Sequence, residues 1–404
     1  ILSTNRLTDL SGLANANLPN LTYLNLDHNL MTDLNGLTDA NLPSLTRLIL
    51  STNRLTDLSG LANANLSNLT ILDLNNNEIR DINPIVNLTS LTGIYLSTNR
   101  LTNLNGLTNA NLSNLTILDL NNNEIRDINP IVNLTSLTGI YLSTNRLTNL
   151  NGLTNANLSN LTILDLNNNE IRDISPIVNL TSLTGLDLSY NQLTDLKGLT
   201  NANFPNLTAL YLSYNQLTDL NGLTDANLPN LTILDLNNND VQNILPLAES
   251  TGFKLVSQIH LHKNPLGRID ILIHIPALKA RGVTVQFDYP VDWNMVSTLA
   301  GDIDGNNSVN ILDLVIVAMQ FGKTGSNLLG DVNGDSLVNV FDLVVVAGNF
   351  DERAVMVAPA VLANKLVYYS AETKYSISCS KIGRNTSVVG GRRTGIQSIE
   401  SYPD

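Results

Sequence analysis

The chain is poor in residues on which several classes of protein depend. It has one cysteine, Cys379, and four histidines among 404 residues. A single thiol excludes a disulfide scaffold and a cysteine-based zinc site. Lys and Arg number 22 against 35 Asp and Glu, which gives a net charge of −13 and leaves no large basic face for nucleic acid. No apolar run approaches the roughly 20 residues of a membrane helix.

The sequence also lacks the short motifs of common enzymes. It contains no H-E-x-x-H, no G-x-S-x-G and no phosphate-binding loop. Its many aspartates are spaced by an internal repeat rather than by a catalytic geometry. We therefore expect a binding protein rather than an enzyme. A catalytic domain upstream of Ile1 is the alternative that the sequence leaves open.

Leucine and asparagine recur with a fixed period. The 46 residues Leu69–Asn114 are repeated without change at Leu115–Asn160. The unit is L-x-x-L-x-L-x-x-N-x-L/I, and twelve such units follow at steps of 22 to 25 residues. Their asparagines are Asn5, Asn29, Asn53, Asn77, Asn99, Asn123, Asn145, Asn169, Asn191, Asn215, Asn239 and Asn264. This spacing is that of the leucine-rich repeat, and the 22-residue units resemble the bacterial internalin-like class.

The repeat predicts an α/β solenoid with one parallel sheet. Leu72 and Leu74 point to the same side of a short strand, because side chains alternate along a strand. Each unit buries its leucines only against its neighbours, so stability is a nearest-neighbour sum. The asparagine amide should bond backbone groups of its own and the adjacent turn. Gly and Pro on the far side of each turn disfavour long helices and predict 3₁₀ or irregular segments there.

The outward strand positions form the predicted concave face. Aspartate and tyrosine alternate along its middle, a mixture that suits recognition of a protein or glycan. A solvated face copied by duplication, without a ligand, is the alternative. The candidate ligand-binding residues are Asp73, Tyr95, Asp119, Tyr141, Asp165, Asp187, Tyr211, Asp235 and His260.

Composition divides the chain into five segments. The repeat array covers residues 1–244, and 245–290 reads as a terminal cap with a strand at Gln258–His262, a short helix at Ala277–Arg281 and a strand at Val283–Phe287. Residues 291–300 read as a linker, 301–350 as a separate module, and 351–404 as a poorly ordered tail without any period.

Residues 301–350 contain two matching segments, GDIDGNNSVNILDL and GDVNGDSLVNVFDL, 29 residues apart. All six acidic residues between 301 and 350 occupy positions 1, 3, 5 or 12 of these loops, as oxygen ligands of a hard cation would. We therefore predict two Ca²⁺ ions. The first site comprises Asp302, Asp304, Asn306, Ser308, Asn310 and Asp313, and the second Asp331, Asn333, Asp335, Leu337, Asn339 and Asp342, with Ser308 and Leu337 offering backbone carbonyls.

The tandem G-D-x-[DN]-G-[DN]-x-x-V-N-x-x-D-L segments resemble a type I dockerin. The resemblance implies two EF-hand-like calcium loops, each followed by a helix, and docking onto a cohesin of a polysaccharide-degrading assembly. Position 6 is Asn307 and Ser336 where glycine is usual. The recognition positions are apolar here, namely Ile311, Leu312, Val340 and Phe341, so they either contact a different kind of partner or pack the two helices, expected at 312–321 and 341–350, together.

These observations predict a secreted or cell-surface calcium-binding protein. Its array would bind a protein or glycan ligand, and its dockerin-like module would dock it to a protein partner. One alternative is an internalin-like adhesin whose calcium module is only stabilising. The other is a fragment of a larger glycoside hydrolase.

Overall fold

The computed structural model describes residues 1–62, 64–250, 257–267, 269–288, 301–306, 308–324, 328–333 and 336–350. The chain divides into two compact units. The first comprises residues 1–266 and 275–288, and the second comprises 267–274 and 289–404. The expected linker at 291–300 and the tail at 351–404 with Cys379 lie outside the described residues, as do Asn307 and Asp335 of the two acidic loops.

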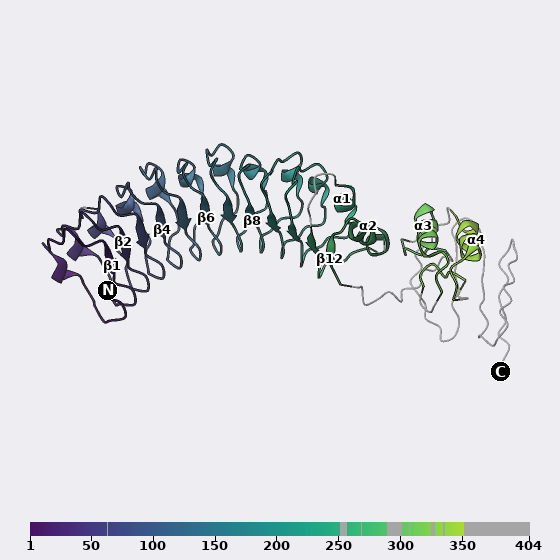
Figure 1. The fold of residues 1–404 in the computed structure, drawn as a ribbon, viewed down its shortest axis with the longest axis horizontal. Helices are drawn as coiled ribbons and strands as arrows, with labels where there is room; N and C mark the ends of the chain where they lie inside the picture. The colour runs from purple at the N-terminus through teal and green to yellow at the C-terminus, as the bar shows by residue number, and fades with distance from the viewer. Residues whose placement is uncertain are drawn as a thin grey trace, which may run out of the picture. The chain divides into compact units, whose positions relative to one another are not determined.

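The first unit is built on one twelve-stranded parallel sheet whose strands follow each other in chain order, as the repeat predicted. Figure 1 shows the stack as a curved coil in which the short helical turns line the convex edge and the strands follow one another beneath them. The strands are β1 (Tyr23–Asn25), β2 (Arg47–Ile49), β3 (Ile71–Asp73), β4 (Gly93–Tyr95), β5 (Ile117–Asp119), β6 (Gly139–Tyr141), β7 (Ile163–Asp165), β8 (Gly185–Asp187), β9 (Ala209–Tyr211), β10 (Ile233–Asp235), β11 (Gln258–His260) and β12 (Thr284–Gln286).

Each strand is three residues long because only a short L-x-L segment faces the neighbouring repeat. Leu72 and Leu74 are fully buried, whereas Ile71 and Asp73 on the other side are half-buried. The same division recurs in the other repeats, so the core is a column of leucine and isoleucine inside the coil. Its stability therefore depends on contacts between successive repeats.

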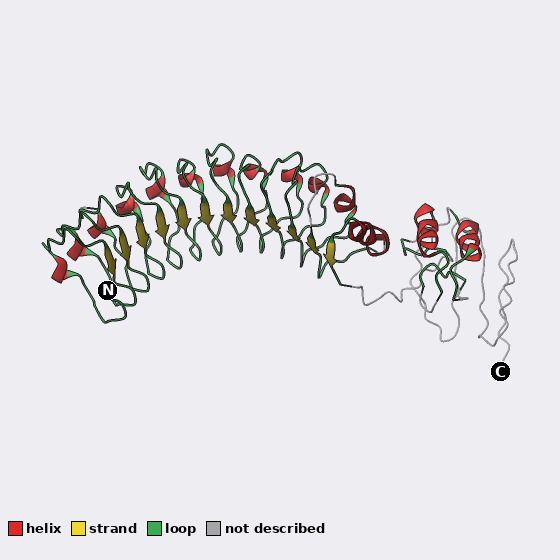
Figure 2. Ribbon diagram, in the orientation of Figure 1, coloured by secondary structure: helices red, strands yellow, loops and turns green. Residues whose placement is uncertain are grey.

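The outer side of the coil carries short 3₁₀ helices, which confirms the prediction from Gly and Pro (Figure 2). The motif N-P-I begins η4 and η6, where proline occupies the first turn and needs no N–H partner. The segments are η1 (Ser11–Leu13), η2 (Asn35–Leu37), η3 (Ser59–Leu61), η4 (Asn83–Ile85), η5 (Asn105–Leu107), η6 (Asn129–Ile131), η7 (Asn151–Leu153), η8 (Ser175–Ile177), η9 (Lys197–Leu199) and η10 (Asn221–Leu223).

The repeated asparagine forms the predicted ladder. The side chain of Asn145 is buried, and its Nδ2 donates to the carbonyls of Leu142 at 3.1 Å and Leu120 at 2.9 Å. Its Oδ1 accepts from the N–H of Ile125 at 3.0 Å. One amide thus satisfies backbone groups of two consecutive turns, which explains why the position tolerates so little variation along the array.

The two ends of the array differ in detail from the expectation. The unit of Asn5 has no described strand before it, and its Leu2 N–H bonds the carbonyl of Asn25. The twelfth strand is instead β12, at the expected strand Val283–Phe287. The cap region also contains α1 (Leu245–Glu249), a π-helical turn η11 (Asp270–His274) and α2 (Ile275–Ala280). Gly282 follows α2 with a left-handed φ of 88° and ends it as predicted.

Besides η11, the described part of the second unit contains α3 (Ile311–Gln320) and α4 (Val340–Gly348), close to the expected ranges. Both begin with the same capping box. The Asn310 Oδ1 accepts from the Leu312 N–H, and the Asp313 carboxylate accepts from the Asn310 N–H. Asn339 and Asp342 repeat this arrangement at α4. The core between the helices comprises Ile303, Val309, Ile316, Val317, Val338 and Val346.

Candidate functional site

The concave face brings the nine predicted ligand-binding residues into one column. All nine occupy the third position of consecutive strands from β3 to β11, and each is paired in register with the next. Adjacent parallel strands lie about 4.8 Å apart, so side chains of neighbouring strands in this column can contact the same ligand. All nine side chains are half-buried rather than covered.

Hydrogen bonds to the following turn hold the aspartates of this column in place. The Asp119 Oδ1 accepts from the Asn121 N–H at 3.1 Å. The Asn121 Oδ1 in turn accepts from the Ser143 N–H of the next repeat at 2.7 Å. The same contacts recur one duplication earlier, with Asp73 and Asn75. Each carboxylate therefore accepts a hydrogen bond from the turn that follows it in its own repeat, and this contact orients the accepting oxygen.

Burial affects the pKa of three of these carboxylates. It raises the pKa of Asp73, Asp119 and Asp165 above the usual range, and the backbone N–H that each accepts opposes the rise. For Asp165, the charges of Asp187 and Asp119 raise the pKa further. The centre of the concave face thus concentrates negative charge in a partly desolvated surface, where an opposite charge is attracted more strongly than in bulk water.

Two tyrosines of this column, Tyr95 and Tyr141, lie over the glycine of their own strand, whereas Tyr211 follows Ala209. An added Cβ on Gly93 would meet the Tyr95 ring at 3.2 Å and the Cδ1 of Ile71 at 2.9 Å. The same two contacts recur around Gly139, from Tyr141 and Ile117. The motif Gly-x-Tyr therefore makes a flat aromatic surface on the sheet, because the glycine leaves the space that the ring fills.

One exposed feature escaped the sequence-based prediction. Tyr190 and Tyr214 lie in the turns after β8 and β9, with their rings stacked at a centroid distance of 4.0 Å. They are 46% and 42% exposed, and both have a left-handed φ of 55°. The repeat spacing of 24 residues between two S-Y-N motifs was the signal that could have revealed the pair.

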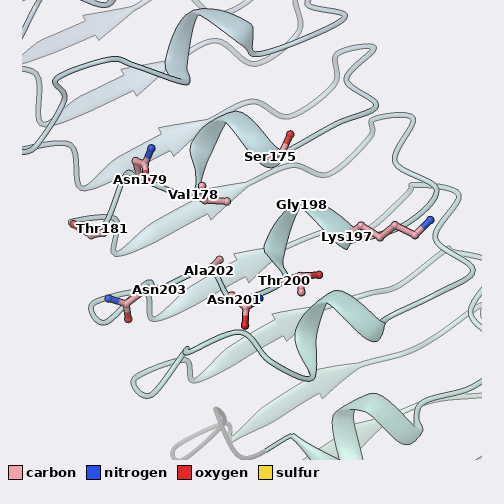
Figure 3. A pocket seen from close by; sticks show the side chains of 10 residues that line it. All are labelled: Ser175, Val178, Asn179, Thr181, Lys197, Gly198, Thr200, Asn201, Ala202 and Asn203. Carbon is pink, nitrogen blue, oxygen red and sulfur yellow. The ribbon is translucent and has the colours of Figure 1, made fainter.

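A shallow pocket of about 370 Å³ lies between the outer turns of two repeats (Figure 3). Its lining comes from η8, η9 and the segments that follow them, and includes Ser175, Asn179, Lys197 and Asn203. The one charged side chain, Lys197, pairs with Asp195 at 3.2 Å. None of the predicted ligand-binding residues lines it, so this pocket is separate from the concave face.

The first acidic loop of the second unit brings three carboxylates together. Single oxygens of Asp302, Asp304 and Asp313 lie within 4.8 Å of one another, and all three residues are buried. Burial, and then the neighbouring carboxylates of Asp313 and Asp302, raise the pKa of Asp304 to about 7. A site of buried oxygen donors that repel one another fits a hard cation such as Ca²⁺.

The other residues predicted for this loop surround the cluster. The Asn306 N–H donates to Asp302 and to Asp304, and the Asn306 Oδ1 accepts from the Ser308 N–H at 2.8 Å. Asn310 caps α3, while its Nδ2 donates to the Ser308 carbonyl at 3.3 Å. The sequence-based prediction gave Asn310 only a ligand role and missed the cap.

The second loop repeats the geometry of the first where it is described. Asp342 is buried and accepts from the N–H groups of Val332 at 2.8 Å and Asn333 at 3.1 Å, as Asp313 does from Ile303 and Asp304. Ser336 adopts a left-handed φ of 68° and donates its N–H to Asp331. Leu337 is 39% exposed and pairs by a single bridge with Thr324. The Asn339 amide caps α4.

The four predicted partner-binding residues lie at the starts of the two helices. Ile311, Val340 and Phe341 are 60%, 54% and 64% exposed, whereas Leu312 is half-buried. Val344, one turn after Val340, is also exposed. Three of the four residues therefore do not pack the helices together, and they leave an apolar surface uncovered.

Comparison with known proteins identifies the family of the repeat array. The profile described as "Leucine rich repeat" matches residues 1–55, 43–101, 89–147 and 181–241, and a profile for two copies of the repeat matches 159–201. The chain belongs to the leucine-rich repeat family. A search among curated proteins finds no match.

Solved leucine-rich repeat structures resemble the chain over most of the array. An internalin, InlF from Listeria monocytogenes, has a TM-score of 0.59 and 29% sequence identity, over 72% of this chain and 81% of that one. The ectodomain of the plant membrane receptor kinase GASSHO1/SCHENGEN3 from Arabidopsis thaliana, solved with CASPARIAN STRIP INTEGRITY FACTOR 2, has a TM-score of 0.50 and 25% identity, over 67% and 35%. No helix among the described residues is long and apolar enough to cross a membrane.

Proposed function

We propose that this chain is an extracellular or cell-surface binding protein whose concave face holds a protein ligand. The observation that carries the proposal is the uncovered column of Asp and Tyr side chains from Asp73 to Asp235, which together with His260 lies at matched register on nine neighbouring strands. Half-buried aromatic rings beside fixed carboxylates combine apolar contact with directional hydrogen bonding, as protein interfaces do. The receptor kinase ectodomain, which was solved with a bound partner, supports a protein rather than a glycan.

The second unit supplies the other half of the proposal. Two Ca²⁺ ions, held by the residues predicted from the sequence, would neutralise the clustered carboxylates and order the loops before α3 and α4. When bound, each cation supplies the positive charge that balances the carboxylates of its loop. The exposed apolar side chains of Ile311, Val340 and Phe341 then form a surface that docks the array to a second protein, and a cohesin-like partner is one candidate.

The exposure of these apolar residues favours docking over a purely stabilising role. A module that served only to stabilise the chain would bury Phe341 rather than leave it 64% exposed. Exchange of Phe341 for Asp should abolish capture of the docking partner without changing calcium binding. An internalin-like adhesin with a stabilising module would instead keep all its interactions after this exchange.

Site-specific photo-crosslinking tests the concave face. A photoreactive residue in place of Tyr141 should crosslink to a protein ligand, whereas one in place of Asn133, exposed beside η6 on the outer side, should not. Equal crosslinking from both positions would contradict the proposal. Binding to a glycan array that is lost in Tyr141→Ala, without any protein crosslink, would show that the ligand is a glycan instead.

A further inference from the structure

The alternation of Asp and Tyr on the concave face breaks at one place. From β3 to β7 the third strand positions read Asp73, Tyr95, Asp119, Tyr141 and Asp165, but β8 ends in Asp187 instead of a tyrosine. Asp165 and Asp187 are therefore direct neighbours in register. Parallel strands lie about 4.8 Å apart, so two carboxylates face the same small surface.

The missing tyrosine leaves an opening in the sheet surface. An added Cβ on Gly185 would meet nothing within 4 Å, in contrast to the crowded positions of Gly93 and Gly139. Those two glycines are buried, whereas Gly185 is half-exposed. Ile163, the register neighbour of Gly185, is 41% exposed. We call the surface formed by Ile163, Asp165, Gly185 and Asp187 the β8 notch.

The two carboxylates of the β8 notch can accept hydrogen bonds beyond those that they already make. The Asp165 Oδ1 accepts from the Asn167 N–H at 3.0 Å, and the Asp187 Oδ1 accepts from the Ser189 N–H at 2.8 Å. Among the described residues no ion pair reaches either carboxylate. Two neighbouring acids without a cation repel each other, and a positive group placed between them would relieve that repulsion.

An apolar surface accompanies the two charges. The exposed side of Ile163 can cover the methylene stem of a long side chain, because such stems pack on apolar surfaces while their charged ends stay polar. A guanidinium group binds carboxylates through its planar fork, which an ammonium lacks.

We propose that the β8 notch receives an arginine side chain from a loop of the protein ligand. The stem would lie over Gly185 against Ile163, and the guanidinium would lie between Asp165 and Asp187. This inference rests on the proposed function of the concave face and specifies one contact within it. It also explains why the notch occurs once, because in the duplicated repeats before it the tyrosine ring occupies the same space.

The test uses the full chain labelled at the δ1 methyl groups of isoleucine and followed by methyl NMR. The probe is N-acetyl-arginine methylamide, and the control probe is its neutral citrulline counterpart, which has a similar length. The arginine probe should shift the Ile163 methyl signal in a saturable way and leave Ile71 and Ile117 unchanged. Equal shifts with the citrulline probe, or no shift of Ile163, would overturn the proposal.

Three variants sharpen this test. Asp187→Tyr recreates the Gly-x-Tyr motif already present in β4 and β6, so it should fold and abolish the Ile163 shift. Asp187→Asn keeps an acceptor for the Ser189 N–H and should weaken binding at least about tenfold, because one charge is lost. Tyr95→Asp should open a second notch and add a saturable shift of Ile71. An unchanged Ile163 shift in Asp187→Tyr, or no new shift in Tyr95→Asp, would contradict the inference.

The inference and the proposed function can fail separately. If photo-crosslinking at Tyr141 captures a protein whose binding is unaffected by Asp187→Tyr, the concave face binds protein and the arginine contact is wrong. If the arginine probe binds but no protein is captured, the notch binds arginine, and the proposal that a loop of a protein ligand supplies this arginine is wrong. Loss of the captured protein in Asp187→Tyr but not in the control Asp127→Asn, on an exposed turn, supports both.

Discussion

The side-chain oxygen of Asn145 accepts a 3.0 Å hydrogen bond from the backbone N–H of Ile125, which belongs to the preceding repeat. The same amide donates to the Leu120 carbonyl of that repeat. Asn145→Ala would leave buried backbone groups of two turns without partners, and we expect a loss of about 1–3 kcal/mol in the free energy of unfolding. Urea unfolding measures this.

The exposed Asn151 provides the control for this substitution. Asn151 lies at the start of η7, on the outer turn that follows Asn145 in the same repeat. Asn151→Ala removes a side chain that makes no hydrogen bond among the described residues. Its effect should stay within about 0.5 kcal/mol. Equal stability of the two variants would contradict the ladder.

Close packing between the outer turns predicts a second effect on stability. A Cβ on Gly222 in η10 would collide with the backbone carbonyl of Leu196 in the preceding repeat. Gly222→Ala should therefore force the turns apart and reduce stability by about 1–3 kcal/mol. Gly12 occupies the same position of the first 3₁₀ turn but has nothing within 4 Å of its added Cβ. Thermal melting of Gly12→Ala should be nearly unchanged, and a similar loss in both variants would show that spacing is not the cause.

Burial of the concave carboxylates predicts a pH dependence. The pKa of Asp119 is raised above its ordinary value of 3.8, chiefly by burial. Because the folded-state pKa lies above the unfolded one, the ionised carboxylate opposes folding at neutral pH. That penalty disappears as the pH falls through the folded-state pKa toward 3.8.

Asp119→Asn should thus stabilise the array slightly at pH 7, by less than about 1 kcal/mol, and the gain should shrink near pH 4. The amide keeps an acceptor for the Asn121 N–H. Asp127→Asn makes the matched control, because Asp127 is exposed and accepts from the Asn129 N–H at 2.9 Å. A gain that is equal at both pH values would rule out ionisation as its origin. Urea unfolding at the two pH values decides.

Removal of calcium should loosen the second unit alone. Without a cation the carboxylates of Asp302, Asp304 and Asp313 repel one another at the N-terminus of α3. Hydrogen exchange of peptides from residues 301–350 should therefore be faster after chelation, while peptides from the repeat array keep their protection. A cation present at a hundred times its Kd would stabilise its site by about 2.7 kcal/mol. If the exchange rates of the 301–350 peptides are the same before and after chelation, calcium binding is contradicted.

The period of the sequence was enough to predict the array, because each structural role depends on one local choice. Leu72 and Leu74 flank Asp73 and point to the same side of the strand, and the Asn of each unit must satisfy backbone groups of two turns, so strand, core and ladder follow from spacing. The count of twelve strands was also predicted, although β12 rather than the unit of Asn5 supplies one of them.

The properties that depend on side-chain exposure could not be predicted in the same way. The ring of Tyr95 covers Gly93, whereas Asp187 leaves Gly185 open, and only packed coordinates separate these outcomes. The cap made by Asn310 was missed because an Asn nine residues into a calcium loop also suits a ligand. The exposure of Phe341, one of two open possibilities from the sequence, depends on how α3 and α4 pack.

Calorimetric titration of the full chain with Ca²⁺ tests most directly whether the acidic loops are cation sites that prepare a docking module. The wild-type chain should bind two ions, and Asp302→Ala and Asp331→Ala should each remove one, since each of the two residues belongs to a different loop. Titrations that are unchanged in both variants, or a wild-type chain that takes up no calcium, would contradict the calcium sites and with them the proposed docking function.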